Sequence, residues 1–207
     1  MTLDEALAAL SEGRPLPGNG ARECMLPEYR RGPYSWPAPA VWKDAAVLIL
    51  LYPDAGLVRF PLMLRASGSG VHSGQISLPG GARENGERME ACALRETREE
   101  FGIDPSSIRV IRGLTPLGVT PSSFLVRPYV GVTDGRPAFR PSPAEVQALL
   151  ETSLDELLDS GNRLETHMEL GGRSWRVPYY HLAGKTIWGA TALILAELEA
   201  MLRAQGA

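Results

Sequence analysis

The run GGARENGERMEACALRETREEFGI, residues 80–103, decides how the rest of the chain is interpreted. Its second half is predicted to be a helix that ends at Gly102, a residue type favoured just beyond helix C-termini. On such a helix Glu96, Glu99 and Glu100 stand at positions i, i+3 and i+4 and project from one face. Like charges at this spacing repel by roughly 0.2–0.5 kcal/mol per pair, and a cation bound between them would reverse the sign. The pattern therefore raises the question of a metal site.

The type of ion follows from the type of ligand. Carboxylates are hard oxygen ligands, which favour Mg²⁺ or Mn²⁺. Mg²⁺ binds through few carboxylates and keeps positions for water and substrate phosphates, an arrangement suited to attack on a diphosphate. The alternative interpretation is a solvated helix face on which Arg95 and Arg98 neutralise the glutamates. For an isolated E-x-x-E-E motif the solvated face is the favoured interpretation. The choice between it and a metal site therefore depends on the surrounding residues.

Those surroundings resemble the Nudix box of the Nudix hydrolases. The box runs Gly, five residues, Glu, seven residues, Arg-Glu, an apolar residue, any residue, Glu-Glu, any residue, Gly and an apolar residue. The charged, glycine and final apolar positions are filled here by Gly81, Glu87, Arg95, Glu96, Glu99, Glu100, Gly102 and Ile103. Thr97 stands where an aliphatic residue is usual, and its methyl group can still pack. So many positions at fixed spacing make chance agreement remote.

The resemblance implies a fold and a chemistry. The fold is the Nudix α/β/α sandwich, of α/β or α+β class, with a mixed β-sheet between helices. Glu96, Glu99 and Glu100 would ligate one or more divalent cations, and the carbonyl of Gly81 would add a ligand. The reaction would be substitution at phosphorus by water, in which the metal polarises phosphate oxygens and lowers the pKa of the attacking water.

Other roles in the box concern its shape and the transfer of a proton. By resemblance, Glu87 and Arg95 would form a structural ion pair that shapes the loop, and Gly102 is a structural position at the end of the helix. The resemblance implies a general base from the box or from a later loop: the candidates are Glu96 and Glu145, and the latter lies in PSPAEV, where a loop is expected to lead into a helix. The alternative for Glu145 is an acidic residue in the first turn of that helix, which the helix dipole favours.

Residues flanking the box resemble one branch of the family, the coenzyme A pyrophosphatases. The similar stretches are HSGQISLPGG (72–81), TPSSFLVRPYVG (120–131) and IWGATALIL (187–195). This implies that the substrate is coenzyme A or an acyl-CoA, cut to 3′,5′-ADP and 4′-phosphopantetheine or its acyl form. Many members of the branch have Leu-Arg shortly before the histidine, where this chain has the uncharged SGSGV (67–71). A basic contact to the 3′-phosphate is therefore missing or supplied elsewhere.

Candidate substrate contacts can be named near these stretches. Gln75 can form hydrogen bonds, and Arg65 and Arg127 can pair with phosphates because guanidinium groups match phosphate geometry. The alternative for either arginine is an ordinary exposed position at a strand end. Trp188 is expected to anchor the core. Two competing functions remain: a Nudix pyrophosphatase acting on ADP-ribose, NADH, dinucleoside polyphosphates or (d)NTPs, and a catalytically silent module that senses a nucleotide.

Composition limits the partners. The chain has 207 residues, 44% hydrophobic and 22% charged, with a net charge of −3, so no basic face points to nucleic acid. The start MTLDEALAAL lacks the basic and apolar regions of a signal peptide, and residues 45–51 are too short to cross a bilayer. We therefore expect a cytoplasmic protein that binds a small nucleotide, without a membrane partner and with a homodimer as an open possibility. Cys24 and Cys92 form no disulfide framework, and Cys92 is predicted to be a packed thiol.

The chain is predicted to have two parts. Residues 1–40 would form an N-terminal helix, capped by Thr2, followed by a Pro/Gly-rich arm, and residues 41–207 would form the Nudix domain. Strands are predicted by short apolar runs, and helices by amphipathic or acidic runs between turn signals. The predicted strands are 45–52, 57–66, 108–114, 125–132 and 175–182, and the predicted helices are 3–10, 88–101, 144–158 and 190–203.

Overall fold

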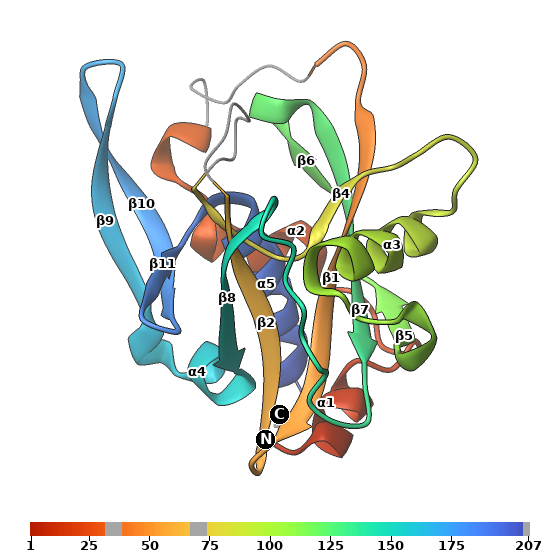
Figure 1. Cartoon of the computed structure of the whole chain (residues 1–207). Coiled ribbons are helices and arrows are strands. Elements are labelled where there is room, and N and C mark those ends of the chain that lie inside the picture. Colours follow the sequence, from red (N-terminus) through yellow and green to blue (C-terminus); the bar gives the residue numbers. More distant parts are fainter. Residues whose placement is uncertain (32–38, 67–73, 205–207) are drawn as a thin grey trace.

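The computed structural model describes residues 1–31, 39–66 and 74–204 (Figure 1). The loop predicted at 67–71 and His72 lie outside the described residues. The helices are α1 (Leu3–Ala9), α2 (Gly18–Arg22), α3 (Met89–Phe101), α4 (Leu154–Leu158) and α5 (Gly189–Arg203), with short 3₁₀ helices that include η2 (Glu28–Arg30) and η5 (Thr120–Ser122). The strands are β1 (Lys43–Asp54), β2 (Leu57–Arg65), β3 (Ile76–Ser77), β4 (Gly80–Ala82), β5 (Arg109–Gly113), β6 (Leu117–Val119), β7 (Phe124–Val132), β8 (Val146–Ser153), β9 (Arg163–Leu170), β10 (Arg173–Leu182) and β11 (Lys185–Ile187).

A mixed sheet forms the centre of the molecule. In the described part of the chain it has eight strands, with the path β3-β2-β1-β7-β5, while β4 pairs with β1, β6 with β7 and β8 with β2. Strands β1 and β7 are parallel, from Lys43 beside Phe124 to Leu51 beside Val132. The remaining pairs are antiparallel. Strand β1 is therefore central, and it carries the pairing that positions both β4 and β7.

Helices cover both faces of this sheet. Side chains of a strand alternate between faces, so a strand covered on both sides is apolar almost throughout. In β1, Ala45, Ile49 and Leu51 pack in the cluster that includes α5, while Ala46, Leu48 and Leu50 pack in the cluster that includes α3. Figure 1 shows α3 and α5 on opposite sides of the strands. The predicted sandwich of a mixed sheet between helices is confirmed.

The helix predicted over residues 144–158 is wrong for most of its length. Residues 146–153 form β8, which pairs antiparallel with β2, for example Phe60 beside Thr152. A helix begins only at α4. There the Ser153 side chain accepts a hydrogen bond from the backbone N–H of Glu156, and the Glu156 side chain accepts one from the backbone N–H of Ser153, which completes a capping box. The sequence of β8 has no strong alternation, and pairing with β2 overrides its local helix propensity.

The N-terminal segment packs on the domain rather than lying apart from it. Helix α1 has the predicted Thr2 cap, with a capping box to Glu5. The segment contributes to the main core through Ala6, Ala9, Leu10 and Met25, all fully buried. The two-part division at residue 40 stays a prediction.

A second, three-stranded sheet has the order β11-β10-β9 in the described residues. Its β9–β10 hairpin lies at the left of Figure 1, with α4 near its lower end. Strand β10 agrees with the strand predicted at 175–182, whereas β9 was not predicted, because its side chains are mostly exposed and leave no apolar pattern. None of the helices in the described ranges is long and apolar enough to cross a membrane.

Candidate active site

Helix α3 places its glutamates by turning its small and apolar side chains toward the sheet. Cys92, Ala93 and Phe101 are fully buried on the α3 face of the sheet. The packing predicted for Cys92 is confirmed, and burial raises the pKa of its thiol to about 12. Thr97 is fully buried as well, and its hydroxyl donates to the carbonyl of Ala93 at 2.8 Å. The hydroxyl is thus satisfied within the helix, so that Thr97 can stand where the box usually has an aliphatic residue.

Glu100 is the most buried carboxylate of the box. Its side chain has no exposed surface, against 13% for Glu96 and 43% for Glu99. Oε2 accepts from the backbone N–H of Gly80 at 2.8 Å, and Oε1 lies 3.2 Å from Nη2 of Arg65. Burial raises the pKa of Glu100 to about 8, although Arg65 and the Gly80 N–H act in the opposite direction. Oε1 accepts no hydrogen bond from the described part of the chain, so its contact with Arg65 is an ion pair without a hydrogen bond.

Two glycines bring strand β4 close to α3 and β1. A Cβ atom on Gly80 would lie 2.3 Å from the carbonyl oxygen of Ala46, which is backbone and cannot move away. A Cβ atom on Gly81 would lie 2.6 Å from the carboxylate atoms of Glu96. Real Cβ atoms essentially never approach other atoms this closely. The absence of side chains at these positions therefore allows Glu96 and Glu100 to lie directly against β4.

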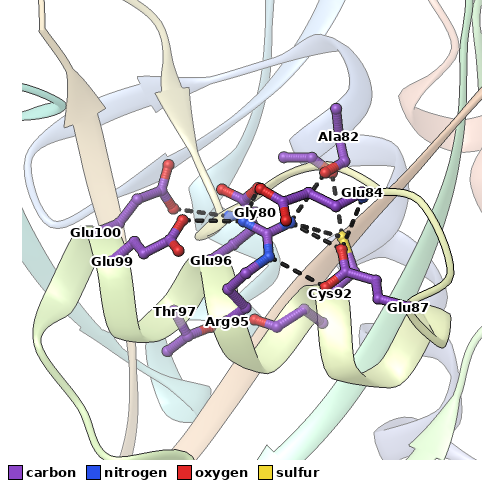
Figure 2. A network of polar contacts seen from close by, with 12 residues as sticks. Gly80, Ala82, Glu84, Glu87, Cys92, Arg95, Glu96, Thr97, Glu99 and Glu100 are labelled. Atoms are coloured by element: carbon purple, nitrogen blue, oxygen red, sulfur yellow. Dashed lines mark hydrogen bonds and ion pairs between the residues drawn. The ribbon is translucent and has the colours of Figure 1, made fainter.

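Arg95 is the centre of a polar network that joins the helix to the loop before it (Figure 2). It donates to both oxygens of Glu87, from Nε at 3.1 Å and from Nη2 at 2.9 Å, so the ion pair expected between them is present. Nη2 also donates to the carbonyl of Ala82 at 3.1 Å. Nη1 donates to Glu96 and to Glu99, both at 2.9 Å. One guanidinium group thus fixes the loop and neutralises two of the candidate metal ligands.

These contacts show how far the site fits a divalent ion. Glu96 and Glu99 already converge on one positively charged atom, Nη1 of Arg95, and an oxygen of Glu100 lacks a hydrogen bond. Together with the carbonyl of Gly81 these are hard oxygen ligands, the type that suits Mg²⁺ and Mn²⁺. Within the described ranges no three acidic side chains already surround one point: Glu96 and Glu99 contact Arg95, whereas Glu100 contacts Arg65. The groups fit the ion in kind, and its binding would require the carboxylates to exchange their arginine contacts for the metal.

Glu145 lies near the same carboxylates, and its position is set by α3. Ser142 N–H donates to the carbonyl of Glu100 at 2.9 Å, and the N–H of Glu145 donates to the carbonyl of Ser142 at 3.1 Å. Burial is the main cause that raises the pKa of Glu96 and of Glu100, and the charge of Glu145 adds to both. Since Glu145 precedes strand β8 and not a helix, the explanation of this carboxylate by a helix dipole is wrong.

A cavity of about 1020 Å³ opens beside β4 on the α5 face of the sheet. Of the residues predicted from sequence, Gly81, Arg65, Gln75 and Glu145 line it. Arg127 does not line the cavity. Its register partner in β1 is Ala46, which faces α3, so Arg127 projects to the opposite face. There its Nη1 lies 3.3 Å from the carboxylate of Asp44. The fold therefore brings Arg65, and not Arg127, to the cavity beside the glutamates.

Several residues of the cavity were not identified from sequence. Trp188, expected as a core anchor, is half-buried and lines the cavity beside Phe124. Tyr29, Arg30 and Lys43 also line it. Two of these belong to the Pro/Gly-rich arm, which has no periodic pattern that could assign them to a face. Only the packing of the arm against the sheet brings them to the site.

Comparisons with known proteins agree with this fold. Residues 42–169 match the NUDIX domain. The chain is 37% identical over 161 residues to Nudix hydrolase 22, chloroplastic, from Arabidopsis thaliana, covering 74% of this chain and 53% of that protein. It is 33% identical over 159 residues to the uncharacterized Nudix hydrolase NudL from Pectobacterium atrosepticum, covering 75% of this chain and 81% of that protein. The chain thus spans about half the length of the Arabidopsis relatives it matches.

Solved structures show the same architecture at low sequence identity. A MutT/nudix family protein from Enterococcus faecalis has a TM-score of 0.52 at 15% identity, covering 96% of this chain and 73% of its own. A MutT protein from Methanosarcina mazei has a TM-score of 0.52 at 18% identity, covering 79% of this chain and 95% of its own. The matched range 42–169 contains β4, α3 and the box glutamates, and this chain belongs to the Nudix family.

Proposed function

We propose that this protein is a metal-dependent pyrophosphohydrolase that cleaves a nucleoside diphosphate derivative, and that its substrate is coenzyme A or an acyl-CoA. The products would be 3′,5′-ADP and 4′-phosphopantetheine or its acyl form. One observation carries the proposal. Glu96 and Glu100 lie directly against Gly80 and Gly81, and those two glycines line the large cavity. A diphosphate bound in the cavity would therefore lie beside the carboxylates.

Each residue of the site has a role in this proposal. Glu96, Glu99, Glu100 and the carbonyl of Gly81 would hold Mg²⁺ or Mn²⁺, which supplies charge stabilisation at phosphate oxygens and a water of lowered pKa. Arg95 keeps its contacts with Glu87 and the Ala82 carbonyl when it releases the other carboxylates, so the loop keeps its shape. Arg65, which is paired with Glu100 in the metal-free site, would be the cation that contacts a phosphate if Glu100 ligated the ion.

The shape and lining of the cavity support a long, partly apolar substrate. Its volume of about 1020 Å³ is at the upper end of the range of about 300–1000 Å³ typical of small-molecule sites. Part of the lining is apolar and would accommodate a pantetheine or acyl chain; it includes Val47, Leu117, Phe124, Leu193 and Ile194. Gln75 on β3's side of the cavity adds a polar side chain that can recognise amide groups.

A substrate panel tests the proposal. CoA, acetyl-CoA, ADP-ribose, NADH, a dinucleoside polyphosphate and dNTPs would be incubated with Mg²⁺ or Mn²⁺, and the products identified by mass spectrometry. We expect 3′,5′-ADP from CoA, and a loss of at least about 100-fold in kcat for Glu100→Gln, because a metal ligand is removed. Glu90→Gln on the same helix is the control and should retain activity. AMP from ADP-ribose or NADH with no 3′,5′-ADP from CoA would reject the CoA assignment.

Two further results would separate the remaining alternatives. Activity unchanged in Glu100→Gln, with nucleotide still bound, would favour the silent sensor. For the general base, Glu145→Gln should lower kcat by about 100- to 10,000-fold with little change in metal affinity, whereas Glu96→Gln should weaken metal binding as well. Equal metal affinity and full activity in Glu145→Gln would assign the base to Glu96. A cytoplasmic location, a homodimer and the absence of nucleic-acid and membrane partners stay predictions.

A further inference from the structure

Two cations line the same cavity at a distance from the box glutamates. Lys43 begins β1, and Val47, four residues further along the same face of that strand, pairs with Gly80 of β4. A strand rises about 3.3 Å per residue, so Lys43 lies about 13 Å along the sheet from the glycine that holds Glu100. Arg30, from η2 in the N-terminal segment, is the second cation in this part of the cavity wall.

Arg30 through its side chain and Lys43 through its backbone contact the same turn of the chain. Nη2 of Arg30 donates to the hydroxyl of Thr120 at 3.4 Å, and the backbone N–H of Lys43 donates to the carbonyl of Ser123 at 2.8 Å. Thr120 begins η5 and Ser123 directly follows it. Ser122 and Ser123 line the cavity as well, so the turn that both residues contact adds hydroxyl groups to the lining.

In the described part of the chain, no acidic side chain pairs with either of these two charges. Neither Arg30 nor Lys43 forms an ion pair within the residues that the structure describes. Arg65, the third cation of the cavity lining, is paired with Glu100. Among the described residues of the lining, Glu145 is the one that is acidic, and it lies near the box, close enough to act on Glu96 and Glu100. The cavity therefore combines an acidic end at the box with a cationic end at the turn of residues 120–123.

We propose that Arg30 and Lys43 bind a second phosphate of the substrate, a phosphomonoester on the nucleoside that is separate from the diphosphate to be cleaved. The inference rests on the proposed function. It assigns the preference for nucleoside diphosphate derivatives that carry an additional phosphate to these two residues. A guanidinium and an ammonium group that line one cavity, together with hydroxyl groups of the turn that both residues contact, match the charge and the hydrogen-bonding capacity of a phosphomonoester. Arg65 and the metal site would then bind the diphosphate.

The test compares two substrates that differ only in this phosphate, CoA and 3′-dephospho-CoA. In the unaltered protein the KM for CoA should be at least tenfold lower than that for dephospho-CoA. Lys43→Ala and Arg30→Ala should each raise the KM for CoA about tenfold, because each removes a charge-assisted hydrogen bond, and should leave kcat and the kinetics of dephospho-CoA nearly unchanged. Lys43→Arg should retain most of the preference.

A matched control is available because the chain has only one other lysine. Lys185 begins β11 and is exposed, and it does not line the cavity. Lys185→Ala should change neither KM. An equal loss for CoA and dephospho-CoA in the Lys43 and Arg30 variants, or no loss for either, would overturn the proposal. Melting temperatures of the variants identify any that fail to fold, and Lys43→Arg then carries the test.

Binding without turnover separates this inference from the proposed function. Calorimetry would compare adenosine 3′,5′-bisphosphate with AMP, both without metal. If CoA is not hydrolysed, yet the bisphosphate binds more tightly than AMP and Lys43→Ala removes the difference, the proposed activity is wrong and the phosphate site stands. If CoA is hydrolysed and bisphosphate and AMP bind equally, the activity stands and the phosphate site is wrong.

Discussion

At the scale of single residues, the absence of a side chain at position 81 determines where a candidate metal ligand lies. A Cβ atom there would lie 2.6 Å from the carboxylate of Glu96. We expect Gly81→Ala to displace Glu96 and to weaken Mn²⁺ binding by about 10- to 100-fold, as other changes around metal ligands do. Isothermal titration calorimetry with Mn²⁺ would measure this effect.

The control for that substitution is Gly13→Ala. An added Cβ at Gly13 meets nothing within 4 Å, so it should alter neither Mn²⁺ binding nor the melting temperature. If Gly81→Ala binds Mn²⁺ as tightly as the unaltered protein, Glu96 is not a metal ligand. The spacing of the box identified Gly81 from sequence, but the steric reason for the glycine became visible only when β4 and α3 were seen in contact.

Glu87 is expected to make stability depend on pH. The hydrogen bond from Arg95 is the main cause that lowers the pKa of Glu87 to about 2, from 4.5. A lowered folded-state pKa stabilises the fold above the unfolded pKa, and the contribution disappears as the pH falls through the folded pKa. Glu87→Gln should therefore cost about 1–2 kcal/mol in the free energy of unfolding at pH 7, and the difference should shrink between pH 4.5 and pH 2. Urea unfolding across this range would measure it.

The neighbouring Glu84 provides the comparison for Glu87. Glu84 is exposed and lies in the same loop, where its backbone N–H donates to Glu87 at 2.9 Å. Replacement of its side chain by Gln should change the free energy of unfolding by less than about 0.5 kcal/mol at any pH, as is usual at exposed positions. A constant difference between Glu87→Gln and the unaltered protein down to pH 2 would contradict the assignment of the low pKa to Glu87.

At the scale of elements, a buried ion pair joins α2 to α5. Arg22 is 3% exposed and Glu197 is fully buried, with Nη2 and Oε2 at 2.5 Å. Glu197 also accepts from the backbone N–H and the hydroxyl of Thr115. Because removal of one partner leaves an uncompensated buried charge, Arg22→Met or Glu197→Gln should lower the free energy of unfolding by about 3–5 kcal/mol. Denaturant unfolding would give both values.

Two comparisons test whether the loss of stability comes from the buried charge: a double variant of the buried pair, and single variants of an exposed ion pair. Arg22→Met combined with Glu197→Leu should cost less than the sum of the single changes, because neither charge is then left alone. Arg176 and Glu165, 3.6 Å apart and both about half exposed, form the control pair, and removing either should cost less than about 1 kcal/mol. Single changes at Arg22 that cost no more than those at Arg176 would show that the arm does not depend on this pair.

The elements also show where local sequence was insufficient. Helix α3 and helix α5 were predicted within one or two residues, because each has an apolar face and clear boundaries. Strand β8 was predicted as a helix because VQALLETS contains good helix formers, and only pairing with β2 decides otherwise. This error also affected the site, since it suggested a helix dipole as the reason for Glu145.

At the scale of the whole molecule, we expect the fold to survive removal of the metal. Arg95 neutralises Glu96 and Glu99, and Arg65 neutralises Glu100, so the acidic residues have partners without an ion. EDTA should abolish hydrolysis and leave the circular dichroism spectrum unchanged. Saturating Mn²⁺ should then stabilise the fold by about 2.7 kcal/mol at 100 times its Kd, since a ligand that binds only the folded state adds to stability.

A substitution of Arg65 tests the same prediction about metal-free stability in a second way. Arg65→Ala leaves Glu100 without its ion pair, so the metal-free protein should lose stability and should recover more of it on addition of Mn²⁺ than the unaltered protein does. Thermal unfolding with and without Mn²⁺ would measure both changes. Two results would contradict the idea that the carboxylates exchange arginine contacts for metal contacts. One is loss of the fold in EDTA alone, and the other is an equal stabilisation by Mn²⁺ in Glu100→Gln and in the unaltered protein.

The sequence by itself determined the family, the sandwich fold and the identity of the box residues, because these depend on spacing along one helix and on apolar runs. The tertiary structure decided which residues share the cavity. Arg65 faces it and Arg127 does not, because the parallel register of β1 and β7 assigns Arg127 to the other face. Arg30, which lies in the N-terminal arm, and Lys43, which begins β1, contact the same turn at residues 120–123. Contacts between distant segments depend on strand register and packing, which no local pattern in the sequence records.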